Sequence, residues 1–216
     1  MKHSLAILDC DSTLCGIEGI DELAADSTPE VREAVAQATT DAMEGRIRLE
    51  EVFAQRMEAL GPSRAQIERV AELYKQTLDP TAVGAIKELR AAGWEIMILS
   101  GGLLPAILPV AMDLKIHRVA AVDVYFDESG AYSDYERTFY TTRSGGKPEC
   151  IRALKLAEPH WQRVIMVGDG VSDLETKPEV DLFVGYGGFA ERPKVREEAG
   201  AWIMRFNELP RLLGIT

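Results

Sequence analysis

Short, continuous runs of apolar residues recur along the chain, and each is bounded by polar or small residues. Such runs predict strands that are buried on both faces, as in a parallel sheet. Four runs fit this pattern, at 5–8, 95–99, 163–167 and 181–184. The sequence therefore predicts at least four neighbouring strands in the interior of one sheet.

Amphipathic segments lie between these runs and predict helices. The segment 80–92, for example, follows Asp79-Pro80 and ends at Gly93, which are residues typical of a helix start and a helix stop. Alternating β and α elements indicate an α/β fold, a Rossmann-like open parallel sheet with helices on both faces. Ligands of such sheets bind beyond the carboxyl ends of the strands.

The gap between the first two strands is too long for one crossover helix. Residues 16 to about 76 predict helices only, the second of them over about 49–60. We therefore expect an inserted helical cap subdomain at 16–76, above a core domain formed by 1–15 and 77–216.

Local signals place the ends of two of these helices and a further insertion. Thr28-Pro29-Glu30 begins one helix, which we expect to end at Gly45. Ser63 begins another, with Gln66 completing a capping box. The stretch of about 121–143 predicts a small β-hairpin flap.

Charge and composition narrow the classes of partner. The 216 residues carry 24 Lys and Arg against 35 Asp and Glu, a net charge of −11. A net negative surface repels nucleic acid and anionic lipid, so we expect neither as a partner. The sequence shows no apolar run that would span a bilayer and no signal-peptide pattern, and its three cysteines suggest reduced thiols, so we expect a cytoplasmic protein. Monomer and homodimer both stay open.

Two carboxylates follow the first predicted strand. Asp9 and Asp11 are two residues apart, so in an extended segment their side chains point the same way. Two negative charges at such a short distance are costly unless a divalent cation or a proton relieves their repulsion. Taken alone, the same stretch is equally well explained as a turn rich in N-capping residues.

Further polar clusters follow later strands. Ser100-Gly101-Gly102, which we expect to end the second strand, offers backbone N–H groups to an anion. Lys147 lies just before a helix expected at 148–157, where a positive charge needs a negative partner. Asp169 and Asp173 follow the third strand.

These motifs, in this order, resemble the four motifs of the haloacid dehalogenase superfamily phosphatases. Within the superfamily they are most similar to the phosphoserine phosphatase family. The likeness continues through 18–24, the Gly-Gly-Lys turn and 185–188, so it extends over most of the chain. The residues that carry it are Asp9-x-Asp11-Ser12-Thr13, Ser100-Gly101-Gly102, Lys147 and Gly168-Asp169-Gly170-x-x-Asp173.

The resemblance implies roles for the matching residues. Asp9 would carry a covalent phosphoryl group, and Asp11 would act as general acid and then general base. Mg²⁺ would be held by the side chains of Asp9 and Asp169 and the carbonyl of Asp11. Asp173 would brace that set and orient Lys147, and Lys147 and Ser100 would neutralise phosphoryl charge.

Substrate choice is expected in the helical insertion. Arg56 falls in the middle of the apolar face of the 49–60 helix, where it fits a ligand carboxylate or, equally, a buried Arg–Glu pair or a snorkelling side chain. Glu18 could accept an ammonium group. Together they describe an amino-acid zwitterion, and both match the substrate-binding positions of the phosphoserine phosphatases, as Met43 does.

The resulting hypothesis is a Mg²⁺-dependent hydrolase of a small phosphorylated amino acid, O-phospho-L-serine. The phosphate-binding set would include Ser100, Gly101, Gly102 and Ser172, the last standing where relatives often have Asn or Thr. A phosphatase or phosphotransferase for another small phosphorylated metabolite is the nearest alternative. A non-hydrolytic binding module is the alternative from another class.

Overall fold

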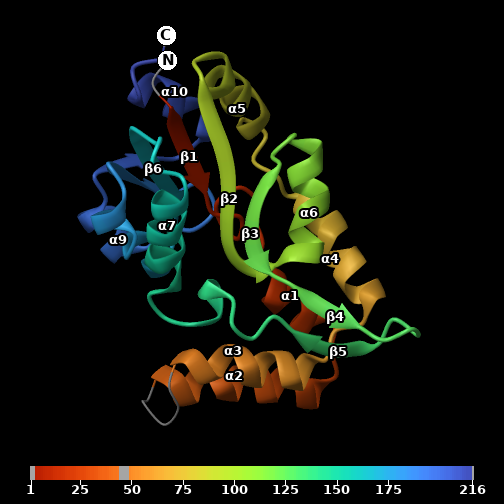
Figure 1. Ribbon diagram of the computed structural model, residues 1–216. Helices are drawn as coiled ribbons and strands as arrows, with labels where there is room; N and C mark the ends of the chain where they lie inside the picture. The colour runs from red at the N-terminus through yellow and green to blue at the C-terminus, as the bar shows by residue number, and fades with distance from the viewer. Residues whose placement is uncertain (1–2, 44–48, 216) are drawn as a thin grey trace.

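A computed structural model of the chain describes residues 3–43 and 49–215, apart from the side chains of 36, 38–43, 49 and 50. Its centre is a parallel sheet of six strands in the order β3-β2-β1-β6-β7-β8 (Figure 1). The strands are β1 (Ser4–Leu8), β2 (Trp94–Leu103), β3 (Arg118–Val122), β6 (Arg163–Gly168), β7 (Leu182–Tyr186) and β8 (Ala201–Ile203).

The order of the strands sets the position of the site. From β1 the chain adds β2 and β3 on one side of the sheet, then crosses to add β6, β7 and β8 on the other. The order therefore reverses between β1 and β6, which pair in parallel with Leu8 opposite Val167. In open α/β sheets the crevice at such a reversal, beyond the carboxyl ends of the strands, is where ligands bind.

All four strands predicted from the sequence are present, but their limits differ. The sequence predicted that β2 would end at Leu99, before Ser100-Gly101-Gly102. This was wrong, because the strand continues to Leu103. Its pairing with β3 shifts register between Leu99 and Leu103, so the two strands meet again at the Leu103–Val122 pair. The polar cluster thus lies within an irregular stretch of strand.

Both faces of the sheet are covered, which confirms the predicted α/β fold. Leu5 and Ile7 of β1 pack into one core with side chains of α7 (Gly146–Ala157) and α9 (Pro193–Glu198). The alternate residues Ala6 and Leu8 pack into a second core. That core includes α4 (Arg64–Gln76), α5 (Ala82–Ala91) and α6 (Leu104–Asp113). This alternation is that of a strand buried on both faces.

The segment between β1 and β2 is helical, as predicted. It contains α1 (Gly19–Ala25), α2 (Pro29–Met43), α3 (Leu49–Leu60) and α4. The helix expected over 49–60 and the capping box of Ser63 with Gln66 are confirmed. The expected helix end at Gly45 lies outside the described residues. In Figure 1, α2 and α3 lie beyond the carboxyl ends of the central strands, whereas α4 runs beside α6.

A small antiparallel hairpin, β4 (Val124–Phe126) and β5 (Tyr132–Tyr135), confirms the core of the predicted flap. The helix predicted from 148 begins earlier, with Gly146 in its first turn and Gly145 as its N-cap. Short elements complete the chain: α8 (Val171–Leu174), α10 (Leu209–Leu212) and three 3₁₀ turns at Tyr140–Thr142, Lys177–Glu179 and Phe206–Glu208.

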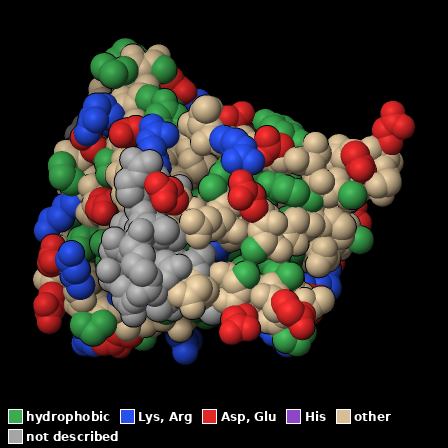
Figure 2. Space-filling view, turned by 90° about the horizontal axis from the view of Figure 1, so that it is seen from below, with side chains coloured by type: hydrophobic (Ala, Val, Ile, Leu, Met, Phe, Trp, Pro, Cys, Tyr) green, Lys and Arg blue, Asp and Glu red, His purple; other side chains and the backbone are tan. Residues whose placement is uncertain are grey.

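The described helices include none that is both long and apolar enough to cross a membrane. Figure 2 views the molecule from below, from the side of α2 and α3 in Figure 1. Acidic and basic side chains are interspersed over the described part of this face. The described part of this face is therefore not uniformly acidic, although the net charge of the chain is negative.

Candidate functional site

The parallel ladder brings the first and last motifs together. Asp9 directly follows β1, and its N–H donates to the carbonyl of Val167 in β6 at 2.9 Å. Asp169 directly follows β6, and Asp173 lies in the short helix α8 that comes next. The two strands end side by side, so the aspartates that follow them meet at the point where the strand order reverses.

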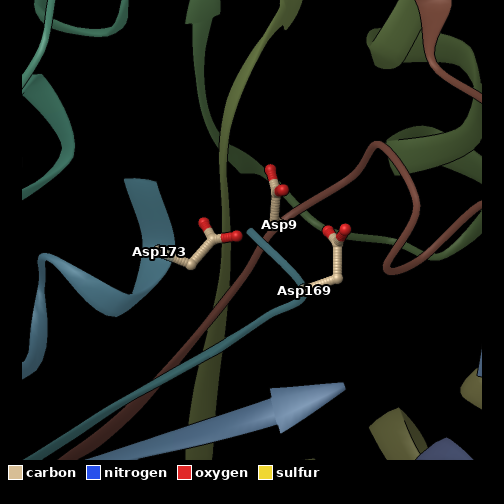
Figure 3. A group of neighbouring side chains, drawn as sticks. All are labelled: Asp9, Asp169 and Asp173. Carbon is tan, nitrogen blue, oxygen red and sulfur yellow. The ribbon is translucent and has the colours of Figure 1, made fainter. Parts of the chain in front are cut away.

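The three carboxylates form one cluster (Figure 3). Asp9, Asp169 and Asp173 each offer an oxygen, and these oxygens lie within 4.8 Å of one another. The residues are 6%, 3% and 0% exposed. In Figure 3, Asp9 comes from the segment after β1, and Asp169 and Asp173 come from the segment after β6. Burying three carboxylates this close together requires nearby positive charge.

Lys147 supplies part of that charge. Its Nζ lies 2.9 Å from Asp9 Oδ1 and donates to Asp173 Oδ1 at 2.6 Å. Burial alone would lower the pKa of Lys147, but the carboxylates of Asp173 and Asp9 raise it above its usual value. Lys147 is therefore protonated at neutral pH. Asp9 and Asp173 are the negative partners that we expected for a lysine at the start of a helix.

One lysine does not neutralise the cluster. Burial and the neighbouring Asp173 raise the pKa of Asp9 well above its usual range, against the opposing effect of Lys147. Although Lys147 is close, Asp9 Oδ1 is buried and accepts no well-aligned hydrogen bond from the described residues. Buried carboxylate oxygens with an unused acceptor are the donor set that Mg²⁺ and similar hard cations prefer.

Asp169 has two further partners that the sequence did not reveal. Its Oδ1 accepts a hydrogen bond from Thr13 Oγ1 at 3.0 Å, and its Oδ2 accepts one from Arg192 Nε at 2.9 Å. Burial nevertheless raises the pKa of Asp169. Thr13 belonged to a quoted motif, whereas Arg192 lies in a loop with no signal of its own. Arg192 therefore contributes positive charge beside the acidic cluster.

The Asp11 carboxylate stands apart from the cluster. Its Oδ1 accepts from the Tyr74 hydroxyl at 2.6 Å and from the Gly19 N–H at 2.8 Å. Its Oδ2 accepts from Ser100 Oγ at 3.0 Å. Ser100 Oγ in turn accepts from the N–H of Gly102 at 3.0 Å. The side chain is thus fixed by donors from three different segments.

A cavity of about 240 Å³ joins these groups. It is lined by residues from the sheet edge and from helices α1 and α3 of the insertion. Ser100, Asp169 and Asp173 are buried next to its wall. The predicted site residues that line it are Asp9, Asp11, Glu18, Arg56, Gly101, Gly102, Lys147 and Ser172.

Glu18 and Arg56, the two residues expected to recognise a zwitterion, have protein partners in this state. Glu18 accepts a hydrogen bond from Ser12 Oγ at 2.6 Å. Burial, followed by the charge of Asp11, raises the pKa of Glu18 to about 7. Arg56 forms an ion pair with Asp21, so its partner is an exposed aspartate and not the buried glutamate of the alternative interpretation. Asp21 is 65% exposed, so the pair is weak and open to competition.

The ion pair with Asp21 does not use every hydrogen-bond donor of Arg56. Its Nε is buried and has no hydrogen-bond partner among the described residues. Thr141 and Arg143 also line the cavity, although no motif pointed to them, and so does Asp21, which lies in the 18–24 stretch but was given no role. The side chain of Met43, expected in the same pocket, lies outside the described part of the chain.

Comparisons with known proteins agree with this geometry. Residues 3–176 match the family model of the haloacid dehalogenase-like hydrolases. The phosphoserine phosphatase of Bos taurus is 34% identical over 203 residues, covering 93% of this chain and 89% of that protein.

Solved structures give the same relationship. A phosphoserine phosphohydrolase-like protein from Francisella tularensis superposes with a TM-score of 0.79 and 26% identity, over 99% of this chain and 100% of that chain. A phosphoserine phosphatase solved as an analogue of its phospho-aspartyl intermediate gives 0.76 and 27%, over all of both chains. The chain therefore belongs to the haloacid dehalogenase-like hydrolases, in the group that contains the phosphoserine phosphatases.

Proposed function

We propose that this protein hydrolyses O-phospho-L-serine to L-serine and phosphate, with Mg²⁺ as its cofactor. One observation carries the proposal: a single cavity is lined by Asp9 beside Lys147 and also by Glu18 and Arg56. The first pair suits a phosphoryl group. The second offers a carboxylate for an ammonium group and a guanidinium for a carboxylate.

Two half-reactions follow from the proposed roles. A carboxylate oxygen of Asp9 attacks phosphorus, forming an O–P bond while the bond from phosphorus to the serine oxygen breaks. Asp11 gives its proton to that departing oxygen. Asp11 then takes a proton from water, whose oxygen attacks the aspartyl phosphate, so that phosphate leaves and the Asp9 carboxylate is restored.

The remaining groups stabilise charge. Lys147, held between Asp9 and Asp173, lies where phosphoryl oxygens must approach, and Ser100 is a hydroxyl donor beside Asp11. Asp9, Asp169 and the carbonyl of Asp11 would hold Mg²⁺, which would supply further neutralisation of phosphoryl charge. Asp173 accepts from the N–H of Gly170 and from Lys147, which supports its proposed role as a brace.

The helical insertion completes the proposed specificity. We assign residues 16–76 to a cap and 1–15 with 77–216 to the catalytic core. The support is that α1 and α3 contribute side chains to the cavity whose floor is the sheet edge. Closing such a cap would exclude bulk water from the reaction.

The substrate assignment is tested at Arg56. We expect Arg56→Ala to raise KM for phosphoserine by about 100-fold, since a charge-assisted hydrogen bond is worth about 1.5–3 kcal/mol. KM for p-nitrophenyl phosphate, which has no carboxylate, should change less than threefold. Arg64→Ala is the matched control, because Arg64 is exposed and stacks on Phe126 outside the cavity.

Steady-state kinetics on the two substrates give the answer. Equal changes in KM on both would refute the pocket assignment. Serine formed without free phosphate when acceptor alcohols are added would show a phosphotransferase instead.

A further inference from the structure

The carboxylate of Asp11 has a hydrogen-bond donor, Tyr74, that belongs to none of the sequence motifs. Tyr74 lies near the end of α4, 63 residues from Asp11, and its side chain is wholly buried. Its hydroxyl donates to Asp11 Oδ1 at 2.6 Å. A short hydrogen bond from a neutral donor to a carboxylate is among the stronger ones in proteins.

The two oxygens of Asp11 are held differently. Oδ1 accepts hydrogen bonds from the Tyr74 hydroxyl and from the backbone N–H of Gly19. These two donors are fixed in place by the helices α4 and α1. Oδ2 receives Ser100 Oγ, a hydroxyl that can rotate toward a phosphoryl oxygen. Tyr74 and Gly19 thus occupy one oxygen and leave the other for chemistry.

We propose that Tyr74 is a positioning residue of the reaction: it fixes Asp11 so that Oδ2 exchanges the proton with the leaving group and with water. The inference rests on the proposed function of Asp11 as acid and base. It adds a residue from the helix that joins the insertion to the core, and this residue does not touch the substrate in the proposed scheme.

The space around the hydroxyl supports this role. A Cβ on Gly19 would lie 2.2 Å from the Tyr74 hydroxyl oxygen. A Cβ on Gly102 would lie 3.1 Å from the same oxygen and 2.7 Å from Asp11 Oδ2. The hydroxyl reaches Asp11 only because both neighbours lack a side chain, so three separate segments of chain are fitted to this one contact.

In this geometry Tyr74 is a hydrogen-bond donor to Oδ1 of Asp11 and does not contact Oδ2. Burial raises the pKa of Tyr74 well above its usual value, and the nearby charge of Asp11 acts in the same direction.

Tyr74→Phe removes only the hydroxyl, and the leaving group reveals the effect. Serine is a poor leaving group that needs a well-placed acid, whereas p-nitrophenolate leaves without one. We expect kcat/KM for phosphoserine to fall about 10-fold, about 1.4 kcal/mol. The value for p-nitrophenyl phosphate should change less than twofold. Across substituted phenyl phosphates, log kcat/KM should depend more steeply on leaving-group pKa than in the wild type.

Tyr186→Phe is the matched control. Tyr186 is equally buried and its hydroxyl also donates to an aspartate, Asp79, which lies outside the cavity lining. This variant should lose stability and keep the wild-type dependence on leaving group. Gly19→Ala, whose methyl group would displace the Tyr74 hydroxyl, should reproduce the effect of Tyr74→Phe, and should add little to it in the double variant.

The outcomes separate cleanly. An equal loss on all substrates in Tyr74→Phe, or none, would overturn the positioning role. If Tyr74→Phe did not fold, the aryl phosphate series on Gly19→Ala would decide it. Failure of the proposed function would look different: the wild type would turn over aryl phosphates and leave phosphoserine intact, while the aryl series would still measure the effect of Tyr74.

Discussion

Lys147, which is buried, and Glu18, which is only partly buried, show two consequences of moving a charged group out of water in one site. Lys147 is stabilised as a cation because two carboxylates outweigh the cost of burial. Glu18 gains a hydroxyl donor and a half-exposed ion pair with Arg192, whose Nη2 lies 3.6 Å away, and its loss of contact with water outweighs both, so its pKa rises to about 7. The charge proposed to bind the substrate ammonium therefore depends on pH near neutrality.

We predict that KM for phosphoserine rises as the pH falls through 7. A raised carboxyl pKa means that the ionised form dominates only above about 7, so protonation below it removes the ammonium partner. The charges facing Glu18 are those of Asp11, Asp169, Asp21 and Arg192. Between pH 8 and pH 6, the ratio of KM for phosphoserine to KM for p-nitrophenyl phosphate should rise about 10-fold.

The ratio cancels the titration of the phosphate group that both substrates share. Glu18→Gln should give a high ratio that no longer varies with pH. A flat ratio in the wild type would show that Glu18 does not bind the ammonium group.

At the residue scale, the sequence predicted the site residues that belong to motifs. It did not predict the residues that reach the site through tertiary packing. Asp9 and Asp169 follow predicted strands, so their convergence could be anticipated, whereas Lys147 was marked by its place at a helix start and by the family resemblance. Tyr74 and Arg192 reach the site through the packing of α4 and of the loop before α9, which no local pattern encodes. The partner of Arg56, Asp21, was equally invisible.

At the scale of elements, hydrophobic pattern and capping residues located the interior strands and five of the longer helices, namely α2, α3, α4, α5 and α7. The strands β3 and β8 were not predicted: they lie at the two edges of the sheet, and β8 is only three residues long. The extension of β2 through Gly101 and Gly102 and the early start of α7 at Gly146 depend on tertiary pairing. Glycine normally signals a break, which is why both limits were misplaced.

The capping box of α4 gives a prediction at this scale. Ser63 Oγ accepts from the N–H of Gln66 while the Gln66 side chain accepts from the N–H of Ser63. We expect Ser63→Ala to lower the free energy of unfolding by about 1 kcal/mol. Thr28, whose hydroxyl oxygen accepts a long, 3.5 Å hydrogen bond from the N–H of Val31 at the start of α2, is the matched comparison, and Thr28→Ala should cost less than half as much.

Urea unfolding followed by circular dichroism measures both variants. Equal losses would mean that the reciprocal bond in the capping box adds nothing to the stability of α4.

At the scale of the whole molecule, the fold gathers charge that the sequence disperses. The chain has a net charge of −11, yet its cavity combines carboxylates with Lys147, Arg56 and Arg143. The sheet brings together residues that lie more than 150 positions apart, and the helical insertion adds the residues proposed to recognise the amino acid. An acidic protein thus presents a locally compensated site to an anionic substrate.

The most direct test of this account is the release of inorganic phosphate from O-phospho-L-serine by the wild-type protein and by Asp9→Asn, each with magnesium chloride and with excess EDTA. We predict rapid release by the wild type with magnesium, and loss of at least about 1,000-fold of that rate with EDTA or in Asp9→Asn. Release by Asp9→Asn at the wild-type rate, or an undiminished rate in EDTA, would contradict the proposed chemistry of the acidic cluster.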